Sequence, residues 1–174
     1  ICDRHGTMMR DRCHTCGSPV AFHRRELGRR SERNFDSVPL CHTCGSDLSR
    51  DPAYDPPCGD VHALIALRSF LTFHDLGWTF CGGEVFHYEH LFTDALYRLC
   101  NFLAVTRGKR LLEVVEQENY GKRLETLSLA QPKEIEFRPL VDRHRLLQAA
   151  FWLLLDWPNR FAGACRLGKV IPSF

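Results

Sequence analysis

The sequence predicts a mainly α-helical protein that begins with a small irregular module. Three observations predict this fold class. A short cysteine motif occurs twice in residues 1–51, which otherwise carry almost no helical periodicity. A proline-rich stretch at residues 52–59 interrupts regular structure, and apolar residues then recur at helical spacing through most of residues 60–174. We therefore expect an amino-terminal module at 1–51, a linker at 52–59 and an all-helical domain at 60–174.

The repeated motif is Cys-His-Thr-Cys-Gly, at residues 13–17 (the first knuckle) and 41–45 (the second knuckle). Two cysteines separated by two residues can direct both sulfurs at one metal ion, and the glycine supplies the tight backbone conformation that follows. Two such pairs complete a tetrahedral site of four thiolates, which is typical of structural zinc. The sequence therefore predicts a zinc-ribbon-like unit that binds Zn²⁺ through Cys13, Cys16, Cys41 and Cys44. Because the module has few large apolar residues, metal binding has to fold it.

Cys2 and His5 form a further half-site with suitable ligand types. In one arrangement they join the first knuckle, and the second knuckle must recruit other ligands such as Cys58 or His62. In the other, they pair with cysteines upstream of Ile1, and the two knuckles close a four-cysteine site by themselves. The second arrangement is simpler, because it leaves no knuckle without a partner.

The connector between the knuckles is polar and basic, and a ribbon would present it as a hairpin or loop at its tip. Its arginines are Arg24, Arg25, Arg29, Arg30 and Arg33. Two interpretations stay open, a solvated loop and a patch that contacts phosphate groups of nucleic acid. The net charge of the chain is only +2, so a nucleic-acid interaction would have to rest on such local clustering.

The pattern of apolar residues predicts five helices, at 60 to about 74, 87–106, 109–119, 143–156 and 158–167. Gly108 is expected to end the second helix, and residues 77–83 to form a turn after the first. Residues 120–139 are expected to be mostly loop. The helix at 143–156 is the most apolar, so it should be central to the core through Leu146, Leu147, Ala150, Phe151, Leu154 and Leu155.

Nine cysteines, four of them in the knuckles, are typical of a protein in a reducing compartment, which favours the cytoplasm. The longest apolar run, at 149–155, is far too short to span a bilayer. Cys81, Cys100 and Cys165 lie in or beside apolar helical patterns and are expected to be small buried hydrophobes. A closed four-thiolate site leaves no coordination position for a substrate, and no nucleophile motif or phosphate-binding loop is present. We therefore predict no enzymatic activity.

The order of these motifs resembles the TniQ family. The resemblance to its zinc-finger part is carried by Cys-Asp-Arg-His-Gly at residues 2–6, by the first knuckle and by residues 40–48. Residues 155–161 are similar to the family's apolar helix followed by a tryptophan-proline corner. In family members a helix-turn-helix region and a further pair of cysteines precede these motifs. Neither precedes them here, so the resemblance implies a fragment that lacks the front of the protein.

Family members select target sites for bacterial transposons. The resemblance implies a bacterial, non-catalytic factor for DNA transposition. It would link a DNA target site, or an RNA-guided Cascade complex, to the AAA+ regulator of transposition. Members that dimerise on Cascade imply a homodimer. Two other function classes stay open from the residues alone: a zinc-dependent DNA-binding transcription regulator, and a structural zinc-stapled protein-interaction domain.

Overall fold

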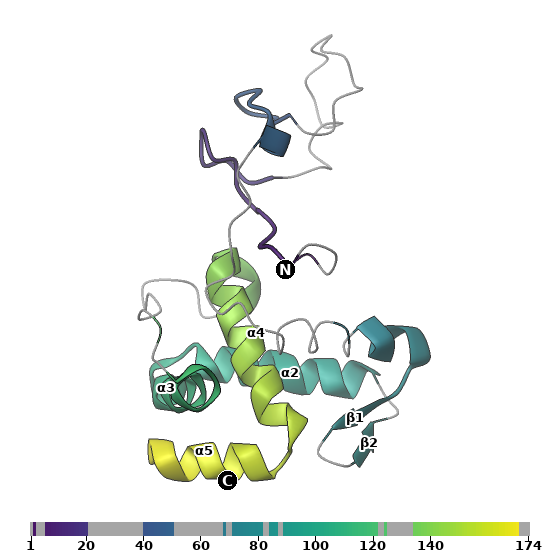
Figure 1. Ribbon diagram of the computed structural model, residues 1–174, viewed down its shortest axis with the longest axis vertical. Coiled ribbons are helices and arrows are strands. Elements are labelled where there is room, and N and C mark those ends of the chain that lie inside the picture. Colours follow the sequence, from purple (N-terminus) through teal and green to yellow (C-terminus); the bar gives the residue numbers. More distant parts are fainter. Residues whose placement is uncertain are drawn as a thin grey trace.

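A computed structural model describes residues 2, 6–20, 40–50, 68, 71–81, 84–86, 89–121, 124 and 134–170, and these parts of the chain are mainly helical (Figure 1). The longer helices are α2 (Glu89–Leu103), α3 (Thr106–Tyr120), α4 (Leu140–Leu155) and α5 (Asn159–Gly168). The shorter elements are the 3-10 helices η2 (Leu48–Arg50) and η3 (Ile135–Phe137) and the strands β1 (Thr79–Cys81) and β2 (Glu84–Phe86). Among the described helices, none has the length and apolar character needed to cross a membrane.

Helix α4 is the centre of the helical core, as its apolar sequence predicts. It contacts α2, α3 and α5, and Leu146 and Leu153 on it are fully buried. The predicted core face needs a correction, because Ala149 and Leu153 are buried whereas Leu155 is 41% exposed. Neighbouring helices cover α4 from several directions. Its buried positions therefore extend around the helix instead of following the single stripe that periodicity predicts.

The prediction that Gly108 ends a helix is wrong. Helix α2 already ends at Leu103, and Gly108 is buried in the first turn of α3. A Cβ atom at position 108 would overlap the backbone carbonyl of Phe102, so glycine here allows two helices to approach closely. The residue that ends α3 is Gly121, whose φ of 66° is in the left-handed region that favours glycine.

The substitution Gly108→Ala is expected to destabilise the protein by about 3 kcal/mol, because the added methyl group meets backbone atoms that cannot move independently. The control is Gly163→Ala in α5, where the nearest atom to a new Cβ is the end of the Arg166 side chain at 4.0 Å. That change should stabilise the protein by about 0.5–1 kcal/mol through helix propensity. Urea denaturation of both variants measures the difference. Equal stability of the two would contradict the close approach at Gly108.

The all-helical prediction for residues 60–174 also needs a correction at residues 79–86. Strands β1 and β2 pair antiparallel there, with Phe80 opposite Val85 and Thr79 opposite Phe86. Aromatic and β-branched residues on both sides of a glycine pair favour a short hairpin over the turn that was expected. The described part of this region is therefore mainly helical, with one small hairpin.

The other helix predictions agree with the structure within a few residues, except that the start of the first lies outside the described residues. The first predicted helix is described at positions 71–76, just before Gly77, and its Phe73 ring makes an edge contact with Phe92 at 5.2 Å between centroids. Helix α4 begins three residues earlier than expected, directly after Pro139. The short η3 helix lies within the stretch predicted to be mostly loop. The proposed linker at 52–59 lies outside the described residues, so the domain boundaries stay a prediction.

Candidate metal centre

The two knuckles have the same backbone structure. In each, the N–H of the first cysteine donates to the carbonyl of the serine five residues later, at 2.8 Å, and the glycine N–H donates to the carbonyl of that cysteine, at 2.9 Å. Gly17 and Gly45 have φ angles of 71° and 73°, which other residues rarely adopt. The sequence repeat is therefore a structural repeat, and its glycines are required by the turn.

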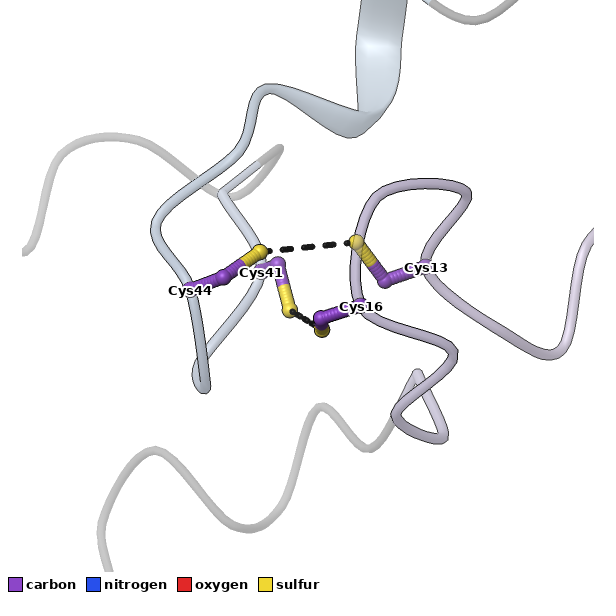
Figure 2. Close-up of side chains that lie close together, drawn as sticks. All are labelled: Cys13, Cys16, Cys41 and Cys44. Carbon is purple, nitrogen blue, oxygen red and sulfur yellow. Dashed lines mark hydrogen bonds between the residues drawn. The ribbon is translucent and has the colours of Figure 1, made fainter.

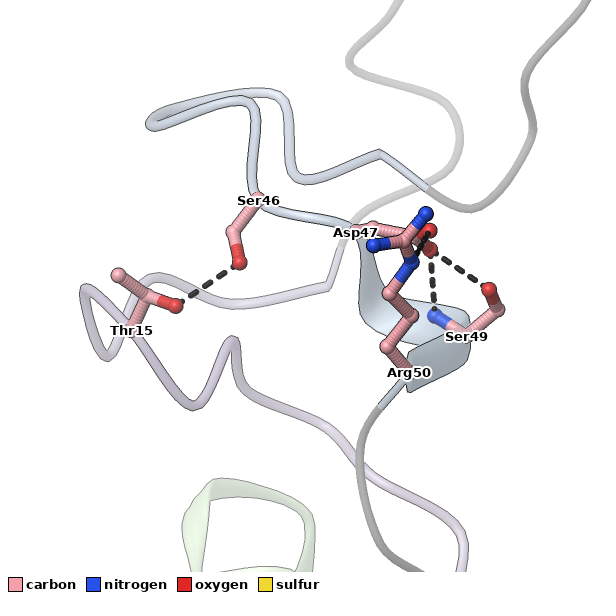
Figure 3. A network of polar contacts seen from close by, with 5 residues as sticks. All are labelled: Thr15, Ser46, Asp47, Ser49 and Arg50. Carbon is pink, nitrogen blue, oxygen red and sulfur yellow. Dashed lines mark hydrogen bonds and ion pairs between the residues drawn. The ribbon is translucent and has the colours of Figure 1, made fainter.

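Polar side chains connect the knuckles with each other and with the chain that follows. The hydroxyl oxygens of Thr15 and Ser46 lie 2.8 Å apart and join the two knuckles (Figure 3). Just after the second knuckle, the Asp47 carboxylate accepts hydrogen bonds from the backbone N–H and the hydroxyl of Ser49, at 2.9 and 2.6 Å, and pairs with Arg50 at 3.0 Å. The bonds from Ser49, and then the charge of Arg50, lower the pKa of Asp47. These contacts fix the start of η2.

The four knuckle cysteines converge (Figure 2). All four sulfurs lie within 4.8 Å of one another, and the Cys13–Cys44 and Cys16–Cys41 pairs are 3.7 Å apart. These separations are much longer than a disulfide bond, and all four cysteines are free thiols. The first cysteine of each knuckle is buried and the second is exposed. The cluster can therefore hold a metal ion, with two ligands from each knuckle.

The thiols of the cluster differ in acidity. Hydrogen bonds from the side chain and the backbone of Ser18 lower the pKa of Cys16 to about 6. The backbone N–H groups of Cys44 and Thr43 lower the pKa of Cys41, as expected for a turn whose N–H groups point at a sulfur. The hydrogen bond from the Ser46 backbone lowers the pKa of Cys44. Desolvation and the other three thiols have a larger opposite effect and raise that pKa to about 12. Four thiolates so close together need a cation between them.

The chain around Cys2 forms a third turn of the same type. The Cys2 N–H donates to the carbonyl of Thr7 at 2.8 Å, and the N–H of Gly6, whose φ is 68°, donates to the carbonyl of Cys2 at 2.9 Å. Cys2 is not part of the four-sulfur group. His5 lies outside the described residues, so metal binding by Cys2 and His5 stays a prediction.

The other predicted site residues have different outcomes. The arginines of the connector, Arg24, Arg25, Arg29, Arg30 and Arg33, lie outside the described residues, and their contact with nucleic acid stays a prediction. Cys100 and Cys165 are buried as expected, and burial raises the pKa of Cys100 to about 12. His14 and His42, between the paired cysteines, are both exposed.

A contact that the sequence did not predict joins the first knuckle to the helical region. The Arg143 guanidinium, in the first turn of α4, pairs with the carboxylate of Asp11 at 3.2 Å. Asp11 precedes the first knuckle by two positions, and its carbonyl also accepts a hydrogen bond from the N–H of Val20. The partners are 132 residues apart, so no local pattern could have revealed them. The pair links the metal unit to the central helix.

Comparisons of the chain with protein-family models, curated proteins and solved structures found no match. The resemblance to the TniQ family therefore rests on the order of its sequence motifs.

Proposed function

We propose that the four-cysteine cluster binds one structural Zn²⁺ ion. Zinc–sulfur bonds of about 2.3 Å place the corners of a regular tetrahedron about 3.8 Å apart. The sulfurs of Cys13 and Cys44, and those of Cys16 and Cys41, are 3.7 Å apart and agree with this size, and all four lie within 4.8 Å of one another. Thiolate ligands also favour zinc over the harder cations magnesium and calcium. Four protein ligands fill the coordination sphere, which supports a structural role for the ion.

We further propose that the protein is a non-catalytic target-site selection factor for DNA transposition. The order of its cysteine motifs, which resembles the TniQ family, supports this role. The protein would link a DNA target site, or an RNA-guided Cascade complex, to the AAA+ regulator of transposition. The zinc unit would hold the two knuckles in a fixed orientation relative to the helical region. Its contact with α4 through Asp11 and Arg143 supports such a rigid connection.

Co-purification with the regulator tests this proposal. A transposase gene and an AAA+ gene beside the gene for this chain would identify the partner to express. We expect the tagged chain and its Cys165→Ala variant to retain the regulator, and the Cys41→Ser variant to lose it. A chain that binds DNA but not the regulator would favour the transcription regulator instead. A chain that binds neither would favour the protein-interaction domain.

A further inference from the structure

The basic residues of α3 are in an unexpected place. Arg107, Lys109 and Arg110 lie in its first turns, and its acidic residues follow, at Glu113, Glu116 and Glu118. The helix dipole favours the opposite order, with acidic residues near the amino terminus. The N-cap residue, Val105, offers no side-chain hydrogen bond to offset this. The stability of α3 therefore does not explain why basic residues begin it.

The carboxy-terminal end of α5 adds further basic residues beside them. Helices α3 and α5 pack against each other (Figure 1). A Cβ at Gly168 would lie 3.5 Å from the carbonyl oxygen of Arg110. Arg166 precedes Gly168 by two positions and Lys169 follows it directly, so both lie at the carboxy-terminal end of α5, which has no acidic side chain. Arg107 precedes Arg110 by three positions and so lies on the same side of α3. We call this set the α3–α5 basic surface: Arg107, Arg110, Arg166 and Lys169.

The four side chains of the α3–α5 basic surface are exposed and have no ion-pair or hydrogen-bond partner in the described parts of the chain. Glu113 follows Arg110 by three residues but is half-buried and does not pair with it. Glu118 is eight residues beyond Arg110, or about 12 Å along the helix. The described residues therefore supply no carboxylate that neutralises the positive charge of this surface.

We propose that the α3–α5 basic surface binds the phosphate backbone of double-stranded DNA without reading its base sequence. Exposed cations that lack carboxylate partners among the described residues suit a row of phosphate groups, and arginine can donate two hydrogen bonds to one phosphate. Single-stranded nucleic acid would call for aromatic side chains on which bases stack. The described part of the chain exposes no large aromatic side chain on α3 or on the last turn of α5. The inference rests on the proposed function, in which the protein acts at a DNA target.

A comparison of two triple variants tests this surface. The surface variant is Arg107→Gln with Arg110→Gln and Arg166→Gln. The control variant, which removes the same charge from exposed arginines elsewhere, is Arg50→Gln with Arg68→Gln and Arg98→Gln. Fluorescence anisotropy of the zinc-loaded chain with a random-sequence duplex, over a range of salt concentrations, gives the affinity. Circular dichroism of both variants establishes that each is folded.

We expect the surface variant to lose about tenfold or more in duplex affinity, and its salt slope to fall by roughly 3, since each phosphate contact contributes about 0.9. The control variant should stay within about twofold of the wild type. Equal losses in both variants, unchanged affinity in the surface variant, or tighter binding of single-stranded RNA would each overturn the inference.

Copurification of the AAA+ regulator is measured separately. Only this inference fails if the wild-type chain retains the regulator and the surface variant binds duplex DNA as tightly as the wild type does. If DNA binding needs the surface but the regulator is never retained, only the proposed function fails.

Discussion

The Cys41→Ser variant is expected to bind no zinc, whereas the wild-type chain is expected to bind one zinc ion. Three thiolates hold zinc far less tightly than four, and the knuckle region has few buried apolar residues, with Met8 as the one large example among those described. Zinc binding contributes about 10–16 kcal/mol to the folding of zinc-finger peptides, so its loss should unfold the metal unit. The helices α2 to α5 have a core of their own and should remain folded. Metal analysis gives the zinc content, and circular dichroism gives the helical content.

The matched control is Cys100→Ala, which removes a buried thiol outside the cluster. This variant should keep one zinc ion. Full zinc occupancy in the Cys41→Ser chain would contradict the four-cysteine site. Two zinc ions in the wild-type chain would show that a second site exists, with Cys2 and His5 as its candidate ligands. Acidification should release the metal, because the ligands bind only as thiolates.

The ligands of the candidate site could be predicted from the sequence because the geometry that directs them is local. Two intervening residues and a following glycine define each knuckle, and Gly17 and Gly45 adopt the left-handed conformation that such a turn requires. Helices α4 and α5 were also predictable, since long apolar patterns and Pro158 define them. Ligand number favoured the pairing of the two knuckles, because four cysteines complete a tetrahedron. The sequence also allowed the first knuckle to pair with Cys2 and His5, and the convergence of the four knuckle sulfurs agrees with the favoured arrangement.

Features that depend on distant parts of the chain could not be predicted. Gly108 looks like a helix stop in the sequence, and only the neighbouring backbone of Phe102 shows why glycine is needed there. The Asp11–Arg143 pair joins residues that are 132 positions apart in the sequence. The basic residues of α3 gain significance only when α5 is placed beside them. In each case the sequence contains the residue, but the tertiary contact gives it a role.

A buried ion pair between α3 and α4 is another such feature. The Arg145 guanidinium donates two hydrogen bonds to one carboxylate oxygen of Glu116, at 2.6 and 3.2 Å, and both side chains are less than 10% exposed. The second carboxylate oxygen accepts the backbone N–H of Leu124 at 3.1 Å. One carboxylate thus connects two helices and the chain that follows α3.

The substitution Glu116→Gln is expected to destabilise the protein by about 3–5 kcal/mol, because it removes the carboxylate charge that the buried Arg145 guanidinium contacts at 2.6 Å. The control is Asp94→Asn, which breaks an ion pair with Arg98 that has the same 2.6 Å separation but lies on the surface. Water solvates the freed Arg98 charge, so this change should cost at most about 1 kcal/mol. Urea denaturation compares the two variants.

The double variant Glu116→Leu with Arg145→Met separates the cost of an unpaired charge from the value of the pair itself. If the unpaired charge is the main cost, the double variant should be more stable than Glu116→Gln although it lacks the pair entirely, because apolar side chains of similar size can fill the same space. If the double variant is instead less stable, the carboxylate contributes through its hydrogen bonds, including the bond to Leu124. Equal effects of Glu116→Gln and Asp94→Asn would contradict the burial argument, since the two pairs differ mainly in their exposure to water.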